Sequence, residues 1–170
     1  MHLAILLWSA FAAWRWGNWR DWKKYHATML FMPISSLMYG LLVNDQNFYL
    51  WRYQSDFLFS EETADAFYTV IAFPAAVLLF LSNYPQGKLG QVLHVLKYVA
   101  IFCTLEWIGM HVGAIKHANG WTMLWSIWFN TLTFMILRIH YTRPGLAYGI
   151  SVAVTLYLLL HFDVPLTDSE

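Results

Sequence analysis

The 170-residue chain is 59% hydrophobic and only 12% charged, where a soluble domain carries about 25% charged residues, so a single soluble core is excluded. The formal net charge is zero, which excludes the basic surface that nucleic-acid binding requires. The one cysteine, Cys103, excludes a disulfide or a thiolate metal site within one chain.

Six apolar stretches reach, or nearly reach, the length of about 20 residues that crosses a bilayer. In chain order they are 2–16, 26–43, 64–82, 91–115, 121–141 and 145–162. We therefore expect 1–170 to form a single all-α domain, an integral membrane bundle of about six transmembrane helices. The first stretch is short, which leaves open whether it spans fully. Its basic residues follow the apolar run, the reverse of a signal peptide, so we expect a retained helix.

Most connections between these stretches are short and contain Gly and Pro, as in 83–87 and 142–145. Short connections favour antiparallel packing of helices that follow one another in the chain. Pro33 and Pro74 fall inside apolar stretches, and we expect them to kink the second and third helices.

The connection 44–60 is longer, acidic and aromatic. Such a segment is typical of an anchor at the level of the lipid headgroups, because an amphipathic ring there contacts apolar groups on one edge and water on the other. The alternative is a lid over an outward-facing site. Ser60, followed by Glu61 and Glu62, predicts a helix start, with a capping hydroxyl and carboxylates in the first turn.

The basic residues predict the orientation. Eight of the ten Lys and Arg residues fall on one side of the predicted bundle: Arg15, Arg20, Lys23, Lys24, Lys88, Lys97, Arg138 and Arg143. Arg52 and Lys116 fall on the other. Because cytoplasmic loops carry the excess of Lys and Arg, we expect both termini outside and a multi-pass protein of the cell membrane.

Glu106 is the most informative residue, because it lies within the fourth stretch, where an ionised carboxylate costs several kcal/mol. The fourth and fifth stretches form a hairpin that turns near Ala118, and this register predicts a hydrogen bond between Glu106 and Asn130. Ser126, Asn130 and Thr133 share one face of the fifth helix at 100° per residue.

These four residues, Glu106, Asn130, Ser126 and Thr133, form the predicted ligand or proton site. Two interpretations stay open. Glu106 handles a proton, a cation or a ligand, or a protonated Glu106 is structural and only holds two helices together.

Arg138, His140 and Arg143 predict a basic rim able to hold anionic lipid headgroups, although the same residues also serve as an orientation signal. No two histidines have the i, i+4 spacing of a helical metal site. Two histidines on facing helices could ligate haem, but boundary positions equally suit an amphipathic ring. We expect no cofactor, no metal site and no catalytic residues.

The sequence resembles a known family over most of the chain from the second apolar stretch onward. The residues that carry the resemblance are Glu106-Trp107, Asn119-Gly120-Trp121, Ser126, Asn130, Leu137-Arg138-Ile139-His140-Tyr141 and Pro144. The pattern resembles an uncharacterised family of small polytopic membrane proteins from spore-forming Gram-positive bacteria. This resemblance implies a membrane protein of bacterial origin and carries no activity.

The sequence shows no Gly-rich phosphate loop, no G-x-S-x-G elbow and no H-E-x-x-H motif, so an enzyme is not the favoured class. The leading hypothesis is a membrane protein that binds or passes a small solute or proton at Glu106 and Asn130. The alternative is a non-catalytic subunit or sensor that acts through a membrane protein partner, and an enzyme acting on lipid is third. Besides the lipid bilayer, a homodimer is an expected partner, because one short chain leaves little room for a transport pathway.

Overall fold

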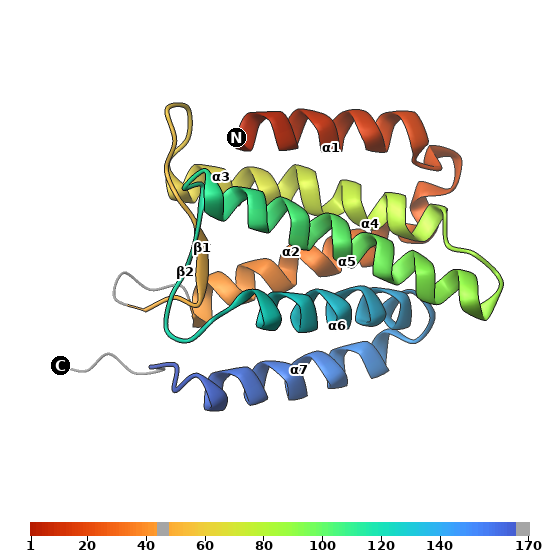
Figure 1. Cartoon of the computed structure of the whole chain (residues 1–170). Coiled ribbons are helices and arrows are strands. Elements are labelled where there is room, and N and C mark those ends of the chain that lie inside the picture. The colour runs from red at the N-terminus through yellow and green to blue at the C-terminus, as the bar shows by residue number, and fades with distance from the viewer. Residues whose placement is uncertain (44–47, 166–170) are drawn as a thin grey trace.

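The computed structural model describes residues 1–43 and 48–165, and it is mostly helical, with 76% of the chain in six helices. The all-α class predicted from the sequence is confirmed. The helices run roughly side by side and form a bundle, and the start of the first helix lies at the same end of it as the end of the last helix (Figure 1).

Each of the six predicted stretches corresponds to one helix. The helices are α1 (His2–Trp16), α2 (Trp22–Leu42), the continuous α3 (Glu61–Phe67), η2 (Tyr68–Ala72) and α4 (Phe73–Ser82), then α5 (Lys88–His111), α6 (Met123–Thr142) and α7 (Pro144–His161). A short 3-10 turn, η1 (Trp19–Asp21), precedes α2. The largest differences are four residues, at the start of α2, predicted at 26 and observed at Trp22, and at the end of α5, predicted at 115 and observed at His111. The helix ends early because Gly113 has a φ of +72° and the chain then enters a strand.

Local signals at the helix ends behave as expected. Ser60 caps α3 and accepts a hydrogen bond from the Thr63 N–H, with Glu61 and Glu62 in the first turn. The segment before Pro74 is the π-helix η2 rather than a simple kink. Pro lacks the N–H of a regular turn and crowds the preceding turn, and widening that turn relieves both conflicts.

A two-stranded ribbon that the sequence did not predict covers one end of the bundle. Strand β1 (Trp51–Tyr53) pairs with β2 (Ile115–His117) in antiparallel register, with Arg52 opposite Lys116. Through this pairing, the segment before α3 contacts the connection between α5 and α6. Strands of three residues carry too little periodicity to be recognised without their partner.

Helix packing follows the chain order only in part. α6 packs between α5 and α7 as expected, but α1 packs on α4, and α2 packs on both α4 and α6. In the described part of the chain α5 lacks close backbone packing against α4, although only five residues connect them. Aromatic side chains, among them Phe80, Tyr98 and Phe134, fill the space between α4, α5 and α6 instead.

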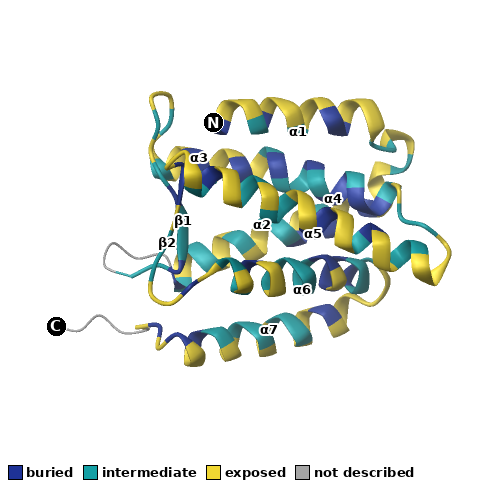
Figure 2. Ribbon diagram, viewed as in Figure 1, coloured by how far each residue is buried: buried dark blue, intermediate teal, exposed yellow. Residues whose placement is uncertain are grey.

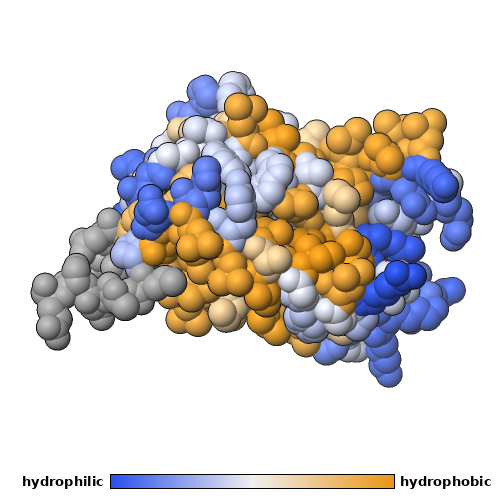
Figure 3. Space-filling model, turned by 90° about the horizontal axis from the view of Figure 1, so that it is seen from below, coloured by the Kyte–Doolittle hydropathy of each residue, from blue (hydrophilic) through white to orange (hydrophobic). Residues whose placement is uncertain are grey.

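The outward faces of the helices are apolar. Glu61–Ser82, Lys88–His111 and Pro144–His161 are long and apolar enough to cross a membrane. Figure 2 shows exposed residues along the outer side of the bundle, and in Figure 3 hydrophobic atoms lie between hydrophilic atoms at the two ends. Exposed leucines, such as Leu41 and Leu160 at about 80% exposure, are typical of a surface that meets lipid.

Candidate functional site

A cavity of about 540 Å³ lies between two halves of the bundle. α1 and α4 form one wall, and α5 and α6 form the other, where the backbones of α4 and α5 stay apart. The ribbon contributes Trp51, Tyr53 and Ile115 to the cavity at one end of the bundle, and Asn83 follows α4 at the other end. The volume falls in the range of about 300–1,000 Å³ that small-molecule sites occupy.

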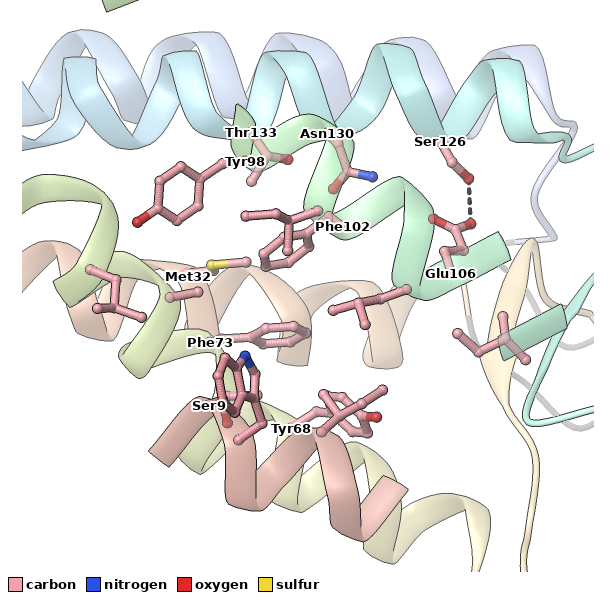
Figure 4. A pocket seen from close by; sticks show the side chains of 18 of the residues that line it. Ser9, Met32, Tyr68, Phe73, Tyr98, Phe102, Glu106, Ser126, Asn130 and Thr133 are labelled. Atoms are coloured by element: carbon pink, nitrogen blue, oxygen red, sulfur yellow. Dashed lines mark hydrogen bonds between the residues drawn. The ribbon is translucent and has the colours of Figure 1, made fainter. Parts of the chain in front are cut away.

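All four residues of the predicted site line this cavity. Glu106 comes from α5, and Ser126, Asn130 and Thr133 come from one face of α6 (Figure 4). The helical periodicity that grouped the three α6 residues therefore places them on a surface that faces protein and cavity rather than lipid.

Glu106 is held by two donors on one oxygen. Its Oε1 accepts a hydrogen bond from the Ser126 hydroxyl at 2.5 Å and one from His117 Nε2 at 2.7 Å. The side chains of His117 and Glu106 are only 7% and 14% exposed. Because a carboxylate oxygen accepts, the proton of this contact belongs to His117 Nε2. The ribbon therefore places a histidine against the carboxylate.

A tryptophan extends this network. Trp121 is buried, and its indole N–H donates to Ser126 Oγ at 2.8 Å. Ser126 thus accepts from Trp121 and donates to Glu106, which fixes the direction of both hydrogen bonds. Each donor in this chain of contacts has an acceptor, as a buried polar network requires.

The predicted hydrogen bond between Glu106 and Asn130 is wrong for the described structure. Asn130 Nδ2 instead faces Cys103 Sγ at 3.7 Å, while Glu106 pairs with Ser126 and His117. The predicted register assumed that the chain turns at Ala118, whereas part of this connection lies in the ribbon. This shifts the pairing of α5 with α6 by about one helical turn, and Asn130 stays in the site as a cavity-lining residue.

The second carboxylate oxygen of Glu106 is free of hydrogen bonds from residues 1–43 and 48–165. Figure 4 shows this oxygen turned away from Ser126 toward the body of the cavity. Two donors already occupy Oε1, so Oε2 is the atom that can take a proton or a ligand donor without disturbing them. Glu106 therefore has one structural oxygen and one open oxygen.

The walls beside Glu106 are largely aromatic. They include Trp51, Tyr53, Tyr68, Phe73, Phe102, Trp121 and Phe129. Tyr53 is stacked on Tyr68 with ring centroids 4.2 Å apart, and burial raises the pKa of Tyr53 well above its usual range, so its phenol stays neutral. The π-helix η2 supplies Tyr68 and Ala72 to the same wall, and such local widening is frequent at functional sites.

Three residues of the site, His117, Trp121 and Tyr53, were not predicted as site residues. His117 follows the fourth apolar stretch and Trp121 begins the fifth, and neither lies on the helix face that the periodicity grouped with Asn130. His117 reaches Glu106 through the ribbon, whose two strands lie about 60 residues apart in the chain, and Trp121 donates to Ser126, which in turn donates to Glu106. The chain turns between His117 and Trp121 at Asn119 and Gly120, which have φ values of +48° and +84°.

The predicted lipid rim is corrected at one residue. Arg143 is exposed, and Arg138 lies over the Tyr84 ring with its guanidinium carbon 4.4 Å from the centroid. His140, however, is 4% exposed, stacks on Phe31 and has Nδ1 2.9 Å from Thr28 Oγ1. It points into the bundle because its position on α6 follows Phe134 and Leu137 on the buried face.

In the described ranges, no three His, Cys, Asp or Glu side chains come together as metal ligands would. Comparisons of the chain with protein-family models, with curated proteins and with solved structures gave no match.

Proposed function

We propose that this protein is a multi-pass membrane protein that binds a small, largely apolar solute in the cavity between α1/α4 and α5/α6. The open oxygen of Glu106 is the polar contact of that solute. One observation carries the proposal: a carboxylate that is only 14% exposed has one oxygen held by Ser126 and His117 and the other facing a cavity of about 540 Å³.

The proposal places all six helices across the bilayer. α2 and α6 have 21 and 20 residues, which at 1.5 Å per residue give about 30 Å, the thickness of the hydrocarbon core. They run beside the three helices that are apolar enough to span, and they expose Leu37, Leu41 and Leu124. α1 has 15 residues and is shorter, so it matches a locally thinned bilayer.

The basic ends of the helices support an orientation with both termini outside. Gln86 lies in the α4–α5 connection at the basic end, and Ser55 lies next to the ribbon at the other end, where both are exposed. In a Cys103→Ser background, Ser55→Cys should react with an impermeant maleimide in intact cells, whereas Gln86→Cys should react only after lysis. Labelling of Gln86→Cys in intact cells would reverse the orientation.

Solute binding is expected to raise the melting temperature of the purified protein in neutral detergent, because a ligand that binds only the folded state stabilises it. Suitable probes are 4-phenylbutylamine and 4-phenyl-1-butanol, each with an apolar body and one donor group that fits Glu106 Oε2. At 100 times its dissociation constant, a probe should contribute about 2.7 kcal/mol of stability.

A matched pair of variants separates cavity binding from effects on the detergent. Thr133→Phe fills the cavity from α6 and should abolish the stabilisation by the probes. Thr131→Phe makes the same change two residues away, outside the cavity lining, and should retain it. The proposal fails if neither probe stabilises the protein, or if Thr133→Phe and Thr131→Phe respond alike.

A subunit or sensor that acts through a protein partner is the second candidate, supported by α7. α7 packs mainly on α6, and only 11% of its membrane-length window is buried. Gly145 and Gly149 have open space where a side chain would be, and such small residues allow close helix contact. Failure of the probes to bind would favour this second function.

A further inference from the structure

Two hydrogen-bond acceptors at the polar end of the cavity are open. Glu106 Oε2 is open, and the Asn130 amide uses its N–H group toward Cys103, which leaves its oxygen available. Lys97 is the one Lys or Arg side chain among the described cavity-lining residues, and it is exposed. It lies nine residues before Glu106 on α5, about 13 Å away along the helix.

The titratable groups around Glu106 contact only one of its two carboxylate oxygens, and the N-terminal ammonium of Met1, which also belongs to the cavity lining, pairs with Asp56. His117 on β2 donates from Nε2 to Oε1, which the neutral imidazole does as well as the charged one. Tyr53 on β1 is a neutral phenol, and the thiol of Cys103 lies one turn before Glu106 on α5. No described side chain donates to Glu106 Oε2, so this oxygen is a polar atom at the cavity surface that still lacks a partner.

We propose that the solute is an organic cation, a protonated amine with an apolar body, and that its ammonium group binds Glu106 Oε2. This inference rests on the proposed function, because it names the class of solute that the same cavity takes. The ammonium supplies both the charge and the hydrogen-bond donor that the open oxygen lacks.

The walls of the cavity fit both ends of such a molecule. Aromatic rings attract cations, and Trp51 and Tyr53 of the ribbon line the cavity together with Trp121, which is hydrogen-bonded to Ser126. Ile5, Phe73 and Phe102 line the rest with apolar atoms that can cover the body of the solute. A neutral alcohol of the same shape would gain the apolar contacts but no charge interaction.

The inference is tested by titration calorimetry with 4-phenylbutylamine, which is a cation at pH 7 like a lysine side chain, and with 4-phenyl-1-butanol. The amine should bind at least about tenfold more tightly than the alcohol, a conservative value for a charge pair near 4 Å. In Glu106→Gln the ratio of the two dissociation constants should fall to about one, because Gln can still accept a hydrogen bond but carries no charge.

The outcomes separate the two proposals. Equal affinities for amine and alcohol, both lost in Thr133→Phe, would overturn the cation inference and leave the proposed function standing. Binding of neither probe would overturn both. Preference for the amine that persists in Glu106→Gln would overturn the assignment of Glu106 as the cation-binding residue, provided that the variant melts like the parent protein.

Discussion

Replacing Glu106 with Leu should be among the most destabilising single changes in this protein. The Ser126 hydroxyl and His117 Nε2–H both donate to Glu106 Oε1, and neither has another acceptor among the described residues. Each donor left unpaired in the interior costs about 1–3 kcal/mol. The expected result is a loss of several kcal/mol in the free energy of unfolding, measured by titration from neutral detergent into SDS.

The conservative variant distinguishes the two roles of Glu106. Glu106→Gln keeps an oxygen that accepts from Ser126 and His117, so its free energy of unfolding should stay within about 1.5 kcal/mol of the parent, the net value of one hydrogen bond. Equal losses in Glu106→Leu and Glu106→Gln would mean that the charge, not the hydrogen bonds, holds the site together.

Phe134→Ala should cost about 3–5 kcal/mol, the usual range for a fully buried Phe. The Phe134 side chain on α6 is 0% exposed and contacts Phe80 of α4 and both Tyr98 and Phe102 of α5. It fills the space between α4 and α5, whose backbones do not pack closely in the described structure. Its removal should therefore loosen the cavity walls as well as the core.

The matched control is the next residue on the same helix. Met135 is 48% exposed on the outer face, so Met135→Ala should change the free energy of unfolding by well under 1 kcal/mol. A cost of Phe134→Ala no larger than that of Met135→Ala would show that the aromatic cluster does not hold α4, α5 and α6 together.

The helices were predictable because their signals are local. Apolar stretches of membrane length, turns with Gly and Pro, and the Ser60 cap each act within a few residues, and each predicted helix is present. The ribbon was missed because β1 and β2 are three residues long and exist only through their pairing. The packing of α1 on α4 depends in the same way on the whole fold.

The sequence predicted residues that form the candidate site, but it did not predict the hydrogen bonds between them. A carboxylate inside an apolar stretch pointed to Glu106, and the 100° periodicity pointed to one face of α6. The hydrogen bonds depend on the axial register of α5 against α6. A shift of one turn replaces Asn130 with Ser126 as the hydrogen-bond partner of Glu106. His117 reaches the site only because the ribbon forms, so no local pattern indicates its role.

The central claim is that a small solute occupies the cavity at Glu106, and anomalous scattering from a bound bromine tests it most directly. Crystals would be soaked separately with the 4-bromophenyl derivatives of 4-phenylbutylamine and 4-phenyl-1-butanol. We expect a bromine peak between α1/α4 and α5/α6 for at least one of them, with its polar end at Glu106 Oε2, and no such peak in Thr133→Phe. Bromine found only on the lipid-facing surface, with the cavity empty for both compounds, would contradict the account.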